Sequence, residues 1–194
     1  MQKRAFVTTV ATAALAGAAP VLAHAASGQA TGPALLTVTG AIGKHNRGAF
    51  DPALDQMMHK QKLGFTQAYT FDFAALSALP AVTIHPTLEY DGKVHALRGP
   101  LLTAVLQAAG AKLDAGALTL RAVDGFAVDL PVAAARRQGF IVATHLDGKP
   151  MALGGLGPLW AVIDADRMAE LANKPVNERF GQCPWALYHI DVRA

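Results

Sequence analysis

The stretch that decides the fold is TIHPTLEYDGKVHALRGPLL, residues 83–102. It predicts a β-hairpin that leads into a helix. One strand is expected over 81–90, a two-residue turn at Asp91-Gly92, a return strand over 94–98 and a helix that begins at Pro100. Asp-Gly favours a type I′ turn, because both central residues of that turn need positive φ. Proline is favoured in the first turn of a helix.

The polar side chains of this hairpin are expected on defined faces. Cross-strand partners share a face and alternate residues switch faces, so His85 is expected opposite Arg98, and His95 opposite Leu88. The two histidines then point to opposite faces and cannot share one zinc ion, unless a bulge at Pro86 changes the register. One face collects a histidine, a carboxylate and a guanidinium, which are His85, Glu89 and Arg98. They could bind an anion over a cleft; the alternative is a solvated face with an ordinary ion pair.

The segments around the hairpin are short and alternate between strand and helix patterns. Strands are expected at 35–40, 69–72, 117–130, 139–145 and in the final WALYHIDV. Helices are expected at 73–80, 100–109, 132–138 and around RMAELA. Asp124-Gly125 and Asp147-Gly148 are expected to be turns. The pattern predicts an α+β domain with mainly antiparallel or mixed sheets and short helices.

Residues 44–66 do not fit this alternation and are interpreted as a helical insertion or lid. Asp51 can cap a helix that begins at the following proline, with an apolar stripe of Leu54, Met57 and Met58. His45, Asp55 and His59 are weak candidates for a metal site with oxygen and nitrogen ligands. Asp55 and His59 lie four apart, on one helical face. The alternative is a solvated helix face.

The N-terminus predicts export. Lys3 and Arg4 precede an apolar, alanine-rich run that ends in Ala-His-Ala, so residues 1–25 are interpreted as a signal peptide; a retained anchor is the weaker alternative. Residues 26–33 then form a flexible leader and 34–194 a single domain. The remaining 15 basic and 14 acidic residues leave a net charge of +1, which favours neither nucleic acid nor an anionic membrane. We expect a periplasmic protein without a membrane span after cleavage.

Several other residues are expected to be structural. His145 and His189 lie in predicted strands, and Trp160 and Trp185 are most simply core residues. The glycines at 154–157 lack the spacing of a dinucleotide-binding loop. Neither a Gly-x-Ser-x-Gly motif nor a recognisable Ser-His-Asp set occurs.

From residue 35 to its end the chain resembles the oxidoreductase molybdopterin-binding domain, the sulfite-oxidase-like fold. The resemblance is carried by the order of LTVTGAI, FDFAALSALPAVTI, ALRGPLLTAVLQAAGA, LTLRAVDGFAVDLP, DGKPMALGGLGPLWAVI and PWALYHIDV. It implies a molybdopterin cofactor bound in a cleft. The likeliest polar lining of that cleft in this chain is His85, Glu89, Arg98 and Asp124.

The chain departs from this family at the metal ligand. Catalytic members bind molybdenum through a cysteine placed just after the strand that here reads AVTIHPTLEY, and this stretch contains none. Cys183, the single cysteine, lies beside the last strand, so we expect no sulfur donor in the cleft. Neither histidine nor glutamate replaces a soft thiolate without changing the chemistry. The family's arginine-rich stretch is also missing, and Lys3-Arg4 stands where a twin-arginine signal would have two arginines.

Two functions remain open from the sequence. The first is an exported protein whose oxidoreductase-like domain lacks molybdenum catalysis and binds a small anion, a metal ion or a protein partner, such as a membrane sensor or redox partner. The second is a genuine periplasmic molybdopterin-dependent oxidoreductase.

Overall fold

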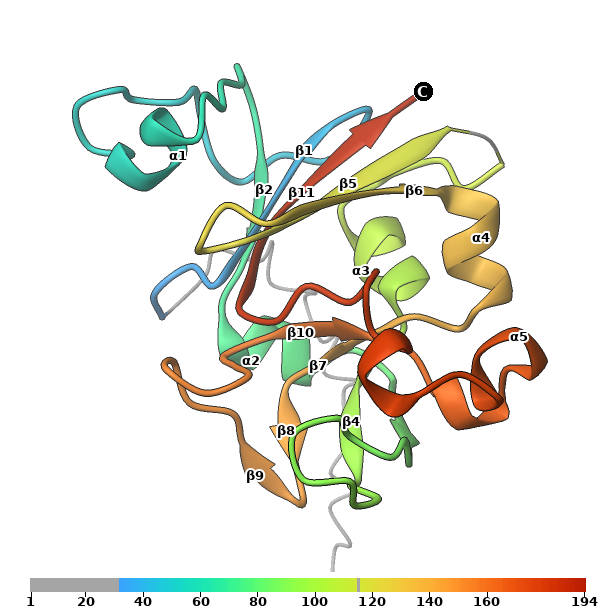
Figure 1. Cartoon of the computed structure of the whole chain (residues 1–194). Helices are drawn as coiled ribbons and strands as arrows, with labels where there is room; N and C mark the ends of the chain where they lie inside the picture. Colours follow the sequence, from blue (N-terminus) through green and yellow to red (C-terminus); the bar gives the residue numbers. More distant parts are fainter. Residues whose placement is uncertain (1–31, 115) are drawn as a thin grey trace, which may run out of the picture.

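A five-stranded mixed sheet forms the centre of the molecule, and residues 32–114 and 116–194 are described in the computed structural model (Figure 1). The expected signal peptide and residues 26–31 of the leader lie outside the described residues. The strand order is β2-β1-β11-β5-β6. Only β1 and β11 pair in parallel; the other three pairs are antiparallel. The bounds are β1 Leu36–Gly40, β2 Tyr69–Phe71, β5 Ala117–Ala122, β6 Ala127–Pro131 and β11 Leu187–Arg193.

Two smaller antiparallel sheets complete the α+β fold expected from the sequence. One has the order β3-β4-β8-β9 and the other pairs β10 with β7. Their bounds are β3 Ala81–Ile84, β4 Leu97–Pro100, β7 Ile141–Ala143, β8 His145–Leu146, β9 Lys149–Pro150 and β10 Trp160–Val162. Gly99 of β4 is needed where the two sheets meet, because a Cβ there would lie 2.0 Å from the carbonyl oxygen of Val142.

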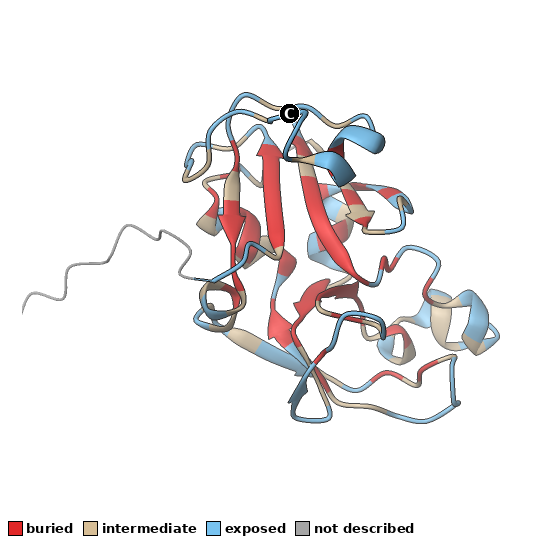
Figure 2. Cartoon of the chain, turned by 90° about the vertical axis from the view of Figure 1, so that its left-hand side faces the viewer, coloured by how far each residue is buried: buried red, intermediate tan, exposed pale blue. Residues whose placement is uncertain are grey.

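The helices are short. They are α1 Gln56–Lys60, α2 Phe73–Ser77, α3 Leu102–Ala108, α4 Val132–Arg137 and α5 Ala169–Ala172, with 3-10 turns η1 Ala165–Arg167 and η2 Val176–Glu178. The helix expected from Pro100 begins two residues later, because Pro100 ends β4. Of the apolar face expected on it, Leu102, Val105, Leu106 and Ala109 are fully buried, whereas Leu101 is 37% exposed. None of the described helices is both long enough and apolar enough to cross a membrane. Figure 2 shows the central strands buried along most of their length, while turns and peripheral helices are exposed.

The register expected for the opening hairpin is wrong by two residues. Thr83, rather than His85, pairs with Arg98, and Thr87 forms a bridge with Val94. The turn is therefore a four-residue loop, closed by the Leu88 amide donating to the Lys93 carbonyl. Gly92 has positive φ but Asp91 does not, so the type I′ geometry is absent. A shift of two keeps the paired residues on their expected faces, but it moves Glu89 and Tyr90 out of the strand and into the loop.

The type I′ argument holds instead at the last Asp-Gly pair of the sequence, Asp147-Gly148. Asp147 and Gly148 have φ values of 49° and 77°, and they join β8 to β9 in a two-residue hairpin in which Leu146 pairs with Lys149. Local sequence thus identified both turns but could not tell which loop length each would adopt. In the first hairpin, contacts outside the turn decide the register.

The insertion at 44–66 is less helical than expected. Its only helix is α1, one turn long, and the Asp51 carboxylate accepts from the amides of Ala53 and Leu54 in a turn that precedes it. The expected apolar stripe is wrong at two of three positions: Leu54 and Met57 are exposed, and only Met58 is buried. A single helical turn presents only one of these side chains to the body of the protein.

Candidate functional site

A groove forms where four loops meet. They are the loop at 88–93, the β5–β6 turn, the segment before β10 and the segment before β11. One part of the groove has a volume of about 270 Å³ and is lined by Glu89, Tyr90, Asp124, Phe126, Phe180, Cys183 and Trp185. The other part, of about 520 Å³, is lined mainly by Val123, Leu153, Gly154, Gly155, Leu156 and Ala186. Tyr90 and Trp185 border both parts, so we treat them as one groove.

The structure brings together two of the four residues expected to line a cleft. Glu89 and Asp124 lie in the same cavity. His85 and Arg98 are exposed and are not among its lining residues; the His85 backbone amide donates to Asp164 instead. The smaller cavity therefore contains carboxylates without the histidine and guanidinium that an anion site would need.

Cys183 borders this cavity, so the expectation of a cleft without sulfur is wrong. Its side chain is only 4% exposed. Burial raises the pKa of the thiol to about 12, and the nearby Glu89 carboxylate also raises it. The sulfur is therefore held as a protonated thiol near neutral pH. Sequence reasoning missed this placement because residues 89 and 183 are far apart in the chain.

Exposed aromatic rings supply the groove walls. Trp185, expected in the core, is 40% exposed, whereas Trp160 is buried as expected. Tyr90 and Phe126 are also exposed. Desolvation and the adjacent Glu89 carboxylate, which is hydrogen-bonded to the Tyr90 side chain, raise the pKa of Tyr90 to about 12. The only sequence signal for these rings was that Phe126 directly follows the Asp124-Gly125 turn.

His95 links the loop that carries Glu89 and Tyr90 to the β8–β9 turn through contacts with two carboxylates. Its Nδ1 lies 2.7 Å from a carboxylate oxygen of Asp147, and its Nε2 lies 3.1 Å from a carboxylate oxygen of Asp91. Hydrogen bonds to these carboxylates raise the pKa of His95 and lower that of Asp147. The pKa of Asp91 is lowered by the hydrogen bond from the Lys93 amide and then by that from His95. Lys93 is the other charged group nearby, 4.0 Å from Asp91. The imidazolium form thus joins two Asp-Gly turns.

We expect the interactions of His95 with Asp91 and Asp147 to weaken as the pH rises. Because the folded pKa of His95 is raised, its contribution is complete below the unfolded pKa of about 6.5 and is lost as pH rises through the folded pKa. Amide exchange protection at Gly92 and Ala96 should therefore be lower at pH 9 than at pH 6. In His95→Gln that difference should vanish, and in His45→Gln, which removes an exposed histidine on another segment, it should persist. Equal protection at both pH values in the wild-type protein would contradict the role of His95.

The candidate metal ligands in the insertion have other contacts. Asp55 is paired with Arg47 and accepts from the amide of Asp51, and the ring of His59 stacks on Phe50. Across residues 32–114 and 116–194, no group of three or more histidine, cysteine or acidic residues could hold a metal ion. His45, Asp55 and His59 therefore do not form a ligand set in this structure. His145 and His189 pack against neighbouring strands, as expected of structural histidines.

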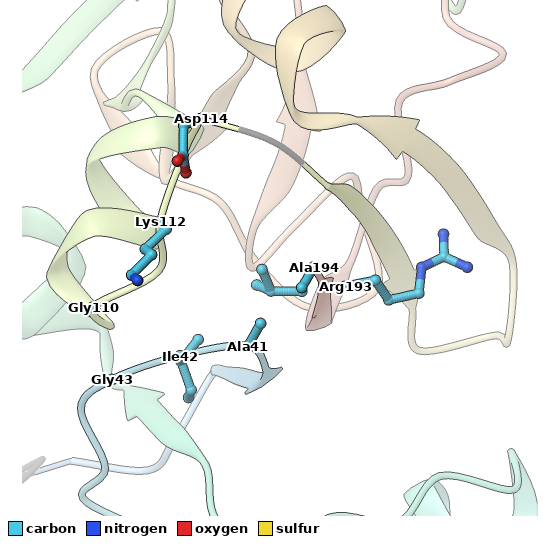
Figure 3. A pocket seen from close by; sticks show the side chains of 9 residues that line it. Ala41, Ile42, Gly43, Gly110, Lys112, Asp114, Arg193 and Ala194 are labelled. Atoms are coloured by element: carbon cyan, nitrogen blue, oxygen red, sulfur yellow. The ribbon is translucent and has the colours of Figure 1, made fainter.

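A second cavity, of about 410 Å³, lies beyond the end of β11 (Figure 3). Its lining combines aliphatic side chains and glycine backbone near 41–43, 110 and 192–194 with the charged side chains of Lys112 and Asp114. The Arg193 side chain extends away from the hollow, and its guanidinium pairs with Asp129. No aromatic ring is among its lining residues, and its charged side chains Lys112 and Asp114 carry opposite signs. We therefore place the candidate site in the groove, where aromatic rings and carboxylates line one cavity.

Comparison with known proteins shows the fold but not a family. No family model matches the chain, and no curated protein matches it. Among solved structures, the sulfane dehydrogenase SoxCD from Paracoccus pantotrophus superposes with a TM-score of 0.52 at 12% sequence identity. The match covers 81% of this chain and 37% of the SoxCD chain, so this chain spans little more than a third of that neighbour. At this identity the likeness indicates a shared fold alone.

Proposed function

We propose that this protein is an exported ligand-binding domain on a sulfite-oxidase-like fold, and that it does not perform molybdenum catalysis. The fold similarity to a sulfane dehydrogenase agrees with the resemblance of the sequence to oxidoreductase molybdopterin-binding domains. The observation that carries the proposal is the groove: four loops build a cavity with aromatic walls and two carboxylates. Concave sites with a few convergent polar groups are where small ligands bind.

The residues of the groove do not fit a molybdopterin. That cofactor carries a phosphate, and the smaller cavity is lined by Glu89 and Asp124 without any lysine, arginine or histidine. Its phosphate would meet negative charge rather than the cationic or amide donors that bind phosphates. The sulfur of Cys183 is buried, and its raised pKa of about 12 opposes formation of the thiolate that a soft metal requires.

One observation favours the second candidate, a molybdopterin-dependent oxidoreductase. Cys183 borders the groove, and loss of its proton on metal binding could offset the raised pKa. The two functions differ in metal content. We expect protein purified from the periplasm of its own host to contain far less than one molybdenum atom per chain by elemental analysis. The N-terminus of the same preparation, expected at residue 26, tests export.

The variant Cys183→Ser makes the metal measurement specific. Under our proposal, the wild-type protein and the folded fraction of the variant have the same low molybdenum content. Stoichiometric molybdenum in the wild-type protein that is lost in folded Cys183→Ser would overturn the proposal and establish the oxidoreductase. A thermal-shift series with small ions and amines tests binding itself, since a ligand of the native state raises the melting temperature.

A further inference from the structure

The groove contains negative charge without a protein cation to neutralise it. Glu89 and Asp124 are the charged side chains of the smaller cavity, and neither part of the groove is lined by lysine, arginine or histidine among the described residues. The Glu89 carboxylate also contributes to the raised pKa values of Tyr90 and Cys183. The Tyr90 phenol and the Cys183 thiol thus stay neutral near pH 7. The Glu89 and Asp124 carboxylates therefore set the sign of the local potential, which attracts a cation.

The aromatic rings of the groove offer exposed faces. Tyr90, Phe126 and Trp185 are three of the large apolar side chains that remain exposed on this protein, and all border the smaller cavity. In the described part of the chain, the cation–π contact is that of Arg47 with Phe65, in the insertion. The groove rings are therefore not already paired with a lysine or arginine. Aromatic faces beside carboxylates are the surroundings in which organic ammonium ions bind.

The walls are held in place before any ligand arrives. The Asp124 carboxylate accepts from the Phe126 amide at 2.9 Å, which fixes the β5–β6 turn. Trp185 forms a backbone bridge with Trp160, and the Trp160 indole donates to the Cys183 carbonyl at 2.9 Å. A preorganised site loses less entropy on binding than one that must first order its loops.

We propose that this groove binds a small organic ammonium cation, either quaternary or alkylated, with its charged head between the carboxylates of Glu89 and Asp124 and the rings of Tyr90 and Trp185. The head-group cavity of about 270 Å³ lies just below the usual range of about 300–1,000 Å³ for whole ligands. The adjoining part, walled by Leu153 and Leu156, receives an apolar substituent of the same ligand. This inference rests on the proposed ligand-binding function and names the class of ligand.

Calorimetric titration with choline tests the inference on the purified mature protein. The neutral control is 3,3-dimethylbutan-1-ol, in which carbon replaces the quaternary nitrogen, and the anionic control is sulfite. Choline should bind at least tenfold more tightly than the neutral isostere, because only the cation gains the cation–π and carboxylate interactions. Choline binding should weaken with rising salt, since these charges are partly exposed.

Matched variants assign the binding to the groove. Trp185→Leu should weaken choline binding about tenfold, and Glu89→Gln combined with Asp124→Asn should weaken it by a similar factor or more. Glu170→Gln, which removes an exposed carboxylate on α5, should leave the affinity unchanged. Tyr90→Leu, at the other ring assigned to the ammonium head and at a side chain that is 57% exposed, provides a second ring variant if Trp185→Leu fails to fold.

The outcomes separate this inference from the proposed function. Equal binding of choline and its neutral isostere, or binding of sulfite without choline, would overturn the ammonium assignment and leave a ligand-binding domain. Choline binding that survives the ring and carboxylate variants would also overturn it. Stoichiometric molybdenum would instead remove the proposed function, whatever the choline titration gives. Failure of all three probes to bind would count against the ammonium site.

Discussion

Trp160→Ala is expected to lower the free energy of unfolding by about 3–5 kcal/mol, the usual range for truncating a buried aromatic side chain. Trp160 is 1% exposed. Its ring packs against Phe180 with centroids 5.8 Å apart, and its indole N–H donates to the buried Cys183 carbonyl. The variant therefore leaves both a cavity and an unpaired carbonyl. Urea denaturation followed by circular dichroism measures the loss.

Two further variants separate the loss of the indole hydrogen bond from the loss of buried volume and provide a control at an exposed site. Trp160→Phe keeps most of the apolar volume but removes the indole donor, so it should cost about 1–3 kcal/mol for the unsatisfied carbonyl. Leu54→Ala, at a side chain that is 83% exposed, should change the stability by no more than about 0.5 kcal/mol. A loss below about 1 kcal/mol in Trp160→Ala would contradict the position of this side chain in the core. Because Trp160 supports the segment at 180–186, the alanine variant should also weaken ligand binding in the groove.

Lowering the pH from 7 to 4 is expected to cost about 3 kcal/mol of stability at His189 alone. This side chain is 2% exposed, and burial lowers its pKa from 6.5 to about 4; the nearby Asp191 opposes the shift and Arg121 adds to it. The unfolded chain therefore binds a proton between pH 6.5 and 4 that the folded protein does not. Stability from this residue is complete above pH 6.5 and is lost as the pH falls toward 4.

The hydrogen bonds of His189 explain why it is held neutral. The Thr39 hydroxyl donates to Asp191, so it accepts from the Nε2–H of His189 at 3.0 Å. Within the described residues, its Nδ1 is buried without a hydrogen-bond partner. A proton on Nδ1 would place an unpaired donor and a charge in the core.

His189→Leu should flatten the dependence of stability on pH between 6.5 and 4 by about 3 kcal/mol. Urea midpoints measured at half-unit pH intervals report the slope, and His59→Gln, at an exposed histidine, provides the control. An unchanged slope in His189→Leu would show that other groups cause the acid sensitivity.

Much of the fold could be predicted from local patterns. The alternation in LTVTG predicted β1, and the spacing of Leu102, Val105 and Leu106 predicted the buried face of α3. These predictions need only the periods at which side chains repeat along a strand and along a helix. Loop lengths could not be predicted in the same way. Asp91-Gly92 and Asp147-Gly148 have the same local chemistry, yet only the second forms a two-residue turn, because contacts of His95 and Thr87 outside the first turn help to set its register.

The site was predicted in part. Glu89 was identified from the polar face of the predicted hairpin, and Asp124 as lining of the cleft that the family resemblance implies; the two do share a cavity. Trp185 and Cys183, which complete that cavity, were not assigned to it. Exposure of a tryptophan depends on which loops cover it, and no period in the sequence encodes that.

The sequence by itself determined the types of the elements, their order and the scarcity of thiols, because these follow from residue chemistry and nearest neighbours along the chain. Only the tertiary structure decided that the loop at 88–93 meets the segment before β11, so that a buried thiol, two carboxylates and several exposed rings border one groove. Contacts between residues almost a hundred positions apart depend on how the sheets pack, and packing is a property of the whole chain.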